Sequence, residues 1–205
     1  MSVLQTARHH VVDQFREPRG PLGRLAGWTM AHKRANNARG RWTVDLLELA
    51  PTDRVLELGY GPGVVAGWLG QAVPDGLVVG IDHSAAMQAQ AARRNAAAVT
   101  AGGLELRVGD AEALPDDLGS FDAACAINVW QFWQDPVATL ESVRRHLHPG
   151  GRLAVTYMQP MRSARPSDEA SGVLLDQLAR AGFGAVDVHE LDHDGRTAIC
   201  CLATN

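Results

Sequence analysis

The stretch from Asp53 to Gly63, with the sequence DRVLELGYGPG, constrains the fold of this chain more than any other stretch. Its apolar first half predicts a short buried strand. The strand ends near Glu57 and leads into a turn with glycines at positions 59, 61 and 63. Glycine adopts backbone angles that other residues avoid, and it lets a ligand approach the main chain closely. The run therefore predicts a loop that binds a nucleotide-type cofactor.

The spacing of these glycines differs from that of two common phosphate-binding loops. The dinucleotide fingerprint has a third glycine or alanine one position later, where this chain has Val64. The Gly-Lys-Ser/Thr sequence of a Walker phosphate loop does not follow the turn either. Glu57 would instead attract a positively charged ligand. The cofactor should therefore be cationic and lack a pyrophosphate, and S-adenosylmethionine meets both conditions. A nicotinamide oxidoreductase is the least favoured alternative.

Acidic residues follow the next two predicted strands. Residues 77–81 form a short apolar run that ends at Asp82, about 20 residues after the glycine turn, where a carboxylate can accept hydrogen bonds from ribose hydroxyls. Residues 104–108 alternate as a strand, and Asp110 behind them can accept a hydrogen bond from an amine such as adenine N6. The two positions predict the ribose and adenine ends of a cofactor site.

Aromatic residues follow the fourth predicted strand, at residues 121–127. In an open parallel sheet, ligands bind beyond the carboxyl ends of the strands. Asn128, Trp130 and Trp133 are therefore candidates to line the space beside the sulfonium, because aromatic faces favour cations and flat apolar acceptors. Plain packing of the tryptophans beneath a loop is the alternative.

The rest of the chain predicts alternating helices and strands that complete an α/β fold. Ser84 is typical of a helix cap, and Asp135 followed by Pro136 is typical of a helix start. Two terminal strands would form a hairpin around His193-Asp-Gly195. The predicted helices cover residues 64–73, 84–100, 136–147 and 167–182, and the remaining strands cover 152–158, 184–191 and 197–203.

Four segments, in this order, resemble class I S-adenosylmethionine-dependent methyltransferases: residues 55–63, 80–84 with Met87, 109–115 and 147–152. The resemblance covers residues 41–205 and is nearest to the small-molecule branch that includes the quinone-biosynthesis methyltransferases. It implies a doubly wound, mostly parallel α/β sheet of seven strands, whose antiparallel last strand lies between the fifth and the sixth. S-adenosylmethionine would be the methyl donor and S-adenosylhomocysteine the product.

The resemblance also implies roles for individual residues. The three glycines would face the methionine part of the cofactor, Asp82 the ribose and Asp110 the adenine. Ala111 would donate a backbone amide to the base, and His83 and Met87 would pack against it. In the simpler alternatives, Glu57 orders the loop, Asp110 caps a turn and Met87 belongs to the core. The predicted cofactor-binding residues are Glu57, Gly59, Tyr60, Gly61, Gly63, Asp82, His83, Met87, Asp110, Ala111 and Asn128.

The charge distribution sets the first 42 residues apart. They carry eight Lys or Arg against two acidic residues, whereas the rest of the chain has a net charge of −10. We predict a basic helical arm over residues 1–42, which is not an independent domain, and a methyltransferase domain over residues 43–205. The arm could contact an anionic substrate, nucleic acid or a membrane surface. Its basic residues are spread rather than clustered, so nucleic acid is not favoured as a partner. We expect the arm to dock on the acidic body and to contribute Trp28 to the substrate pocket, although Trp28 could instead cover a partner subunit in a homodimer.

Composition gives expectations about location and metals. No run approaches 18 apolar residues, and the N-terminus lacks a signal-peptide pattern, so we expect a cytoplasmic protein without a transmembrane segment. Cys125, Cys200 and Cys201 lack the spacing of a zinc site. We predict that they are core residues and that no metal is bound.

Methyl transfer from a sulfonium is an in-line displacement that depends mainly on alignment and the exclusion of water. A general base is optional, and His32 and Tyr157 are the candidates. We expect a small, apolar or aromatic acceptor in contact with Trp28, Trp130, Trp133 and Tyr157, with residues 159–166 as a lid. The Asn/Asp-Pro-Pro-Tyr sequence of enzymes that methylate adenine or glutamine amino groups is absent. This argues against methylation of those groups but leaves other RNA chemistry open. The alternatives are an RNA methyltransferase and a non-catalytic domain that binds the cofactor or a partner protein.

Overall fold

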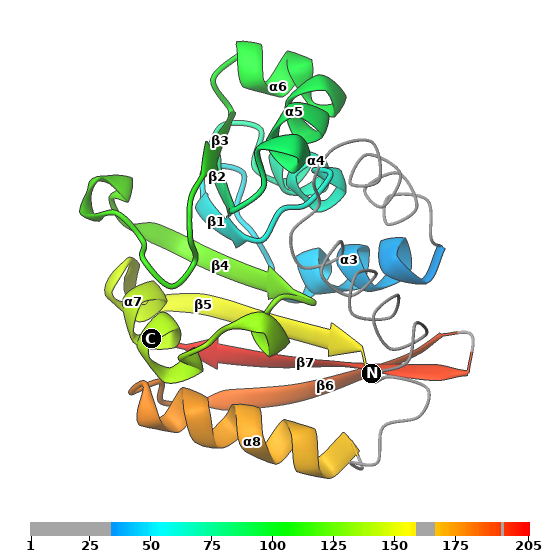
Figure 1. Ribbon diagram of the computed structural model, residues 1–205, viewed down its shortest axis with the longest axis vertical. Helices are drawn as coiled ribbons and strands as arrows, with labels where there is room; N and C mark the ends of the chain where they lie inside the picture. The colour runs from blue at the N-terminus through cyan, green and yellow to red at the C-terminus, as the bar shows by residue number, and fades with distance from the viewer. Residues whose placement is uncertain (1–33, 159–166, 194) are drawn as a thin grey trace, which may run out of the picture.

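A seven-stranded sheet forms the centre of the molecule (Figure 1). The structure is a computed structural model that describes residues 34–158, 167–193 and 195–205. The strand order is β3-β2-β1-β4-β5-β7-β6, and β7 is antiparallel to both of its neighbours while the other pairs are parallel. The strands are β1 Arg54–Leu58, β2 Leu77–Asp82, β3 Leu104–Val108, β4 Phe121–Ile127, β5 Leu147–Met158, β6 Val186–His193 and β7 Arg196–Thr204.

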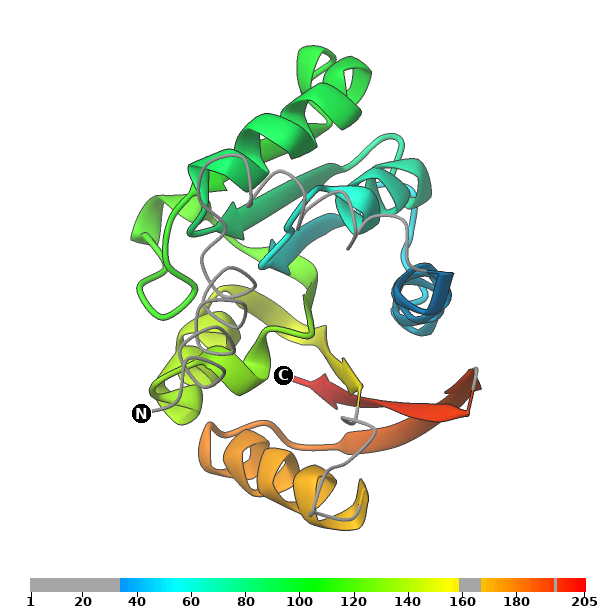
Figure 2. The same cartoon turned by 45° about the vertical axis from the view of Figure 1, so that its right-hand side comes forward.

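Helices cover both faces of this sheet (Figures 1 and 2). On one face lie α3 and α4, with α5 beside α4, and on the other face lie α7 and α8. The helices are α3 Arg34–Leu46, α4 Val64–Ala72, α5 Ala85–Arg94, α6 Ala96–Thr100, α7 Pro136–Arg145 and α8 Ser167–Arg180, and two short 3-10 turns cover Asp116–Leu118 and Trp130–Phe132. No helix in these described ranges is long and apolar enough to cross a membrane.

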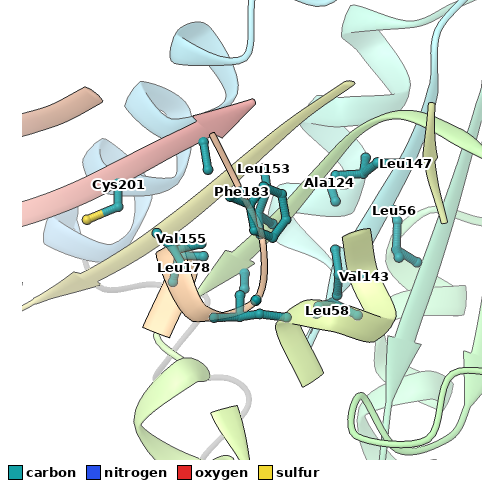
Figure 3. Packing of buried hydrophobic residues seen from close by; sticks show 14 of the residues in the cluster. Leu56, Leu58, Ala124, Val143, Leu147, Leu153, Val155, Leu178, Phe183 and Cys201 are labelled. Carbon is teal, nitrogen blue, oxygen red and sulfur yellow. The ribbon is translucent and has the colours of Figure 1, made fainter. Parts of the chain in front are cut away.

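The core has two layers because successive residues of a strand point to opposite faces of the sheet. On β1, Leu56 and Leu58 pack toward α7 and α8, in the cluster drawn in Figure 3, whereas Val55 packs toward α3 and α4. All three side chains are fully buried. Burial on both faces is typical of parallel strands and explains why the three residues of β1 other than Arg54 and Glu57 are apolar.

The predicted sheet is confirmed, including the insertion of the last strand between β5 and β6. Both predicted helix starts are also present. The Oγ of Ser84 accepts the N–H of Met87 at 3.3 Å, and the Oδ1 of Asp135 accepts the N–H of Ala138 at 3.0 Å. These caps satisfy backbone donors that have no partner inside their own helices.

The boundaries of several elements differ from the prediction. The helix expected over residues 84–100 is interrupted at Asn95, whose amide nitrogen donates to the carbonyl oxygens of Gly63 and Ala91. Strand β5 begins at Leu147 rather than at residue 152, because Leu147 already pairs with Phe121. The predicted division of the chain at residues 42 and 43 falls inside α3.

Candidate cofactor and acceptor site

A cavity of about 500 Å³ lies at the carboxyl ends of β1, β2, β3 and β4, with α3 and α4 forming one side. In a doubly wound sheet this is where ligands bind, because the strand order reverses between β1 and β4. The cavity brings together most of the residues that the sequence singled out. Those that line it are Glu57, Gly59, Tyr60, Gly61, Asp82, His83, Met87, Asp110, Ala111, Asn128 and Trp133.

The three glycines of the turn all have positive φ angles, of 71°, 52° and 75°, which explains why the turn needs glycine. Their surroundings differ. A Cβ on Gly59 would overlap Val129, and a Cβ on Gly63 would lie 2.6 Å from the Cβ of Ala91 on α5. A Cβ on Gly61 would meet nothing within 4 Å. Gly61 therefore faces open space in the cavity, while Gly59 and Gly63 let other parts of the protein come close.

Asp82 holds the glycine turn in place from the end of β2. Its Oδ2 accepts the N–H of Gly61 at 2.8 Å, and its Oδ1 accepts the N–H of Ser84 at 2.9 Å. The residue is 7% exposed, and burial raises the pKa of its carboxyl above the ordinary value, an effect that the two hydrogen bonds oppose. A carboxylate oxygen can accept more than one hydrogen bond, so a ribose hydroxyl could still reach this group.

Glu57 is a buried carboxyl without a hydrogen-bond partner for one of its oxygens. It is 2% exposed, and its Oε2 has no partner among the residues that the structure describes. Burial, and to a smaller extent the charge of Asp82, raises the pKa of Glu57 to about 8. A buried polar atom without a partner is costly, and a cation in the cavity would supply one.

The predicted adenine end lies between β2 and β3. Met87 is buried against Tyr60 and Ala91, as its core alternative predicts, and it also lines the cavity. The Oδ1 of Asp110 accepts the N–H of Glu112 at 2.9 Å, so the turn-capping alternative for Asp110 is present too. His83 is half exposed, and its Nδ1 lies 3.9 Å from the Oδ1 of Asp82.

The predicted acceptor residues divide into two groups. Trp133 lines the cavity, and so does Asn128, which has a φ of 56° and accepts the N–H of Met158 through its Oδ1 at 3.2 Å. Trp130 and Tyr157 do not line it. The indole N–H of Trp130 donates to Gln177 on α8 at 2.7 Å, and its ring centroid lies 5.3 Å from that of Tyr157.

Tyr157 is held in the same way as Trp130. Its hydroxyl lies 3.1 Å from the Oγ of Ser171 on α8, and burial raises the pKa of that hydroxyl. Both residues thus hold the ends of β4 and β5 against α8. For Trp130 this is the packing role that the sequence offered as the alternative. For Tyr157, the raised pKa makes the phenolate form that would act as a base harder to reach. Trp28, His32 and the predicted lid over 159–166 lie outside the described residues.

Sequence reasoning missed several residues of this cavity, among them Phe132, Arg39 and Glu112. Arg39 was named only as one of the basic residues of the arm, yet it is 2% exposed and lines the cavity from α3. The Oε1 of Glu112 accepts the N–H groups of Gln134 and Asp135 at 2.6 and 2.8 Å, and so joins the loop after β3 to the loop after β4. The one signal for Glu112 was its position two residues after Asp110.

Comparisons with known proteins agree with this geometry. Residues 55–151 match the family described as Methyltransferase domain. The chain is 29% identical over 182 residues to the uncharacterized methyltransferase YdaC of Bacillus subtilis, an alignment that covers 87% of this chain and 97% of YdaC. It is 40% identical over 126 residues to the demethylmenaquinone methyltransferase of Thermus thermophilus, covering 58% of this chain and 55% of that protein.

The fold recurs in a solved structure of different activity. The [4+2]-cyclase SpnF superposes with a TM-score of 0.69 at 20% identity, over 85% of this chain and 84% of its own. A shared fold alone does not establish a reaction. The family match and the curated relatives do establish the class: this chain is a class I S-adenosylmethionine-dependent methyltransferase. Its cofactor is S-adenosylmethionine. The Oε2 of Glu57, which has no partner among the described residues, fits a cationic ligand, and the open space at Gly61 in the same cavity gives that ligand room.

Proposed function

We propose that this enzyme transfers the methyl group of S-adenosylmethionine to a small, apolar or aromatic acceptor. The observation that carries the proposal is that one cavity is lined both by two carboxyls at the ends of β1 and β2, Glu57 and Asp82, which we call its acidic wall, and by two aromatic residues that follow β4, Phe132 and Trp133, which we call its aromatic wall. The acidic wall suits a cationic cofactor, and the aromatic wall suits a flat acceptor next to a sulfonium. A relative whose name gives a quinone-type acceptor supports a small molecule.

The proposed roles follow from the contacts of each residue. When bound, S-adenosylmethionine supplies a methyl carbon that its sulfonium activates toward displacement. Glu57 would accept a hydrogen bond from the ammonium group of the methionine part, and Asp82 would accept one from a ribose hydroxyl. Asp110 and the backbone amide of Ala111 would bind the adenine. The open space at Gly61 would allow the ligand to lie against the main chain.

The acceptor side has the tasks of alignment and exclusion of water. Trp133 and Phe132 offer apolar surface. Asn128 is held by its backbone N–H, which donates to the carbonyl oxygen of Thr156, and by its side-chain Oδ1, which accepts the N–H of Met158. An acceptor that must lose a proton would need a base, and His32 remains a candidate on sequence grounds. The hydroxyl of Tyr157 already pairs with Ser171, which weakens its case.

Calorimetric titration with S-adenosylmethionine, S-adenosylhomocysteine and NAD tests the proposed cofactor site. In Gly61→Val, a side chain would fill the open space, so we expect at least about a tenfold loss of affinity for both S-adenosyl ligands. Gly150→Val is the matched control, because Gly150 also has a positive φ and open space around it but does not line the cavity. Equal losses in both variants would show backbone strain rather than a blocked site.

The acceptor class is tested by turnover. Purified enzyme with labelled S-adenosylmethionine should methylate members of a panel of quinols, phenols and aromatic acids. Methylation of RNA at low salt, with no turnover on the small-molecule panel, would replace this proposal with an RNA methyltransferase. Binding of the cofactor with no turnover on either panel would favour the non-catalytic alternative.

A further inference from the structure

Arg39 is a buried cation that the proposed cofactor site does not use. It lies on α3, is 2% exposed and lines the cavity. Its Nη2 donates to the Oδ1 of Asn36 at 2.9 Å. Its Nε and Nη1 have no hydrogen-bond partner anywhere in the described ranges 34–158, 167–193 and 195–205. These two atoms carry three N–H donors, and donors that are buried without partners are costly.

The charges around Arg39 differ from those around Glu57. Burial, followed by the positive charge of Arg196 on β7, lowers the pKa of Arg39 to about 10. No carboxylate of the described residues forms an ion pair with it. Glu57, in contrast, has the negative charge of Asp82 as its charged neighbour. The cavity therefore has an acidic part at the ends of β1 and β2 and a cationic part at α3.

The position of α3 assigns the cationic part to the acceptor side. Helix α3 lies beside the sheet (Figure 2) and contacts β4, β5, β6 and β7 as well as α4. The hydroxyl of Thr43 on this helix lies 2.9 Å from that of Thr156 on β5. The residues proposed for the ribose and adenine belong instead to β2, β3 and their loops. A single guanidinium matches the charge and planar shape of one carboxylate, whereas a phosphate dianion would leave one charge uncompensated.

We propose that Arg39 binds a carboxylate group of the methyl acceptor, so that the acceptor is a small organic acid whose apolar or aromatic part lies against the wall with Trp133. The inference rests on the proposed function, which it narrows to a substrate class. The cofactor also has a carboxylate, at its methionine end, and Arg39 could bind that group instead. The experiment must therefore separate the two.

The test compares ligands with and without each carboxylate. S-adenosylhomocysteine is matched with 5′-methylthioadenosine, which lacks the amino acid part. A panel of aromatic and unsaturated acids, with benzoate, cinnamate and indole-3-acetate, is matched with the corresponding amides. Calorimetry is run on the wild type, Arg39→Gln, Arg39→Lys and Arg41→Gln, and the acids are titrated both with and without saturating S-adenosylhomocysteine. Arg41→Gln is the control, because Arg41 lies on the same helix but is exposed and stacks on Trp68.

We expect at least one acid to bind the wild type and Arg41→Gln at least about tenfold more tightly than its amide, the scale of a charge-assisted hydrogen bond. Arg39→Gln should lose this preference, Arg39→Lys should keep part of it, and neither should change the affinity for S-adenosylhomocysteine. The proposal is overturned if no acid binds, or if the preference survives in Arg39→Gln. It is also overturned if Arg39→Gln weakens S-adenosylhomocysteine about tenfold but leaves 5′-methylthioadenosine unchanged, because Arg39 would then bind the carboxylate of the cofactor.

Two further measurements distinguish a ligand-binding role of Arg39 from a structural one, and a failure of this proposal from a failure of the proposed function. The melting temperature of ligand-free Arg39→Gln should equal or exceed that of the wild type, because the substitution removes a buried charge that has no ionic partner. A clear decrease would make Arg39 a structural residue and overturn the proposal. If the wild type binds neither S-adenosyl ligand, the proposed function fails, while the titration of acids into the ligand-free protein still tests Arg39.

Discussion

At the scale of single residues, the site depends on buried ionisable groups that have no ionic partner among the described residues. Glu57 has an oxygen without a hydrogen-bond partner in the described part of the chain, and two nitrogens of Arg39 are in the same situation. A protein selected for stability alone would replace such groups by apolar ones. Their presence in one cavity, one acidic at the end of β1 and one basic on α3, is the physical reason for assigning them to ligands.

The raised pKa of Glu57 predicts that ligand binding depends on pH. In the empty cavity the carboxyl is mostly protonated below its pKa of about 8, and it must ionise to face a cationic ligand. Affinity for S-adenosylmethionine should therefore increase by up to about tenfold per pH unit between pH 5.5 and 7, because the cost of ionising Glu57 falls as pH rises. Glu57→Gln should bind more weakly at pH 7 and show a flatter profile.

Calorimetry in two buffers of different ionisation enthalpy measures this proton release directly. At pH 6.5 the wild type should release nearly one proton more per bound ligand than Glu57→Gln. Asp82 also has a raised pKa, so the difference between the two proteins carries the test rather than the wild-type value alone. Equal proton release would mean that the carboxyl of Glu57 does not meet the ligand in its ionised form.

At the scale of elements, the loops of the site are held in place by hydrogen bonds between them. Asp82 holds the glycine turn, and Asn128 joins the end of β4 to the end of β5. Glu112 joins the loop after β3 to the start of α7 through two backbone N–H groups. Loops that carry binding residues are positioned by such contacts, since they lack the regular hydrogen bonding of helices and strands.

The two hydrogen bonds that Glu112 accepts give a prediction about the stability of the protein. Glu112→Ala should lower the free energy of unfolding by about 1 kcal/mol, because two backbone donors lose a charged acceptor near the surface. Glu112→Gln should lose about half as much, since its amide oxygen can still accept. Urea unfolding followed by tryptophan fluorescence measures both effects.

Glu141→Ala is the control for that measurement, because Glu141 is exposed on α7 and away from the cavity. A loss in Glu141→Ala as large as that in Glu112→Ala would point to a general effect of removing negative charge. If Glu112→Ala is as stable as the wild type, water replaces the carboxylate, and the two loops do not depend on each other.

At the scale of the whole molecule, segments far apart in the sequence meet at the glycine turn. Val129, from the loop after β4, occupies the space that a side chain on Gly59 would need, and Ala91 of α5 packs against Gly63. The turn is thus a junction between β1, α5 and the β4 loop as well as a wall of the cavity. Only Gly61 is left with open space in front of it.

A double-mutant cycle tests this packing role. Gly59→Ala should lower the free energy of unfolding by about 2 kcal/mol, because it combines a positive φ with an overlap against Val129. Adding Val129→Ala should recover part of that loss, since it removes the overlapping methyl group. The two single changes would then couple by about 1 kcal/mol in denaturant unfolding. Strict additivity would contradict a direct contact between the two side chains.

The sequence determined those features that arise from local pattern. The apolar runs placed β1 to β4, because short buried strands need continuous hydrophobic stretches. Glycine at positions 59, 61 and 63 was required by the positive φ of each residue, whatever lies around them. Asp82 and Asn128 fell at the site because each directly follows or ends a parallel strand, and the ends of such strands meet at one edge.

The tertiary structure decided which of these residues face the cavity. Whether a glycine makes room for a ligand or for the protein depends on Val129 and Ala91, which lie far along the chain. Trp130 turned toward α8 because Gln177 offers it a hydrogen bond, and no local pattern could reveal that partner. Arg39 entered the cavity because α3 packs across the sheet, so a residue that the sequence showed only as one basic residue of the arm became a buried cation. Local pattern fixes the position of a residue along a strand or helix, while its environment depends on contacts between segments that only the folded chain brings together.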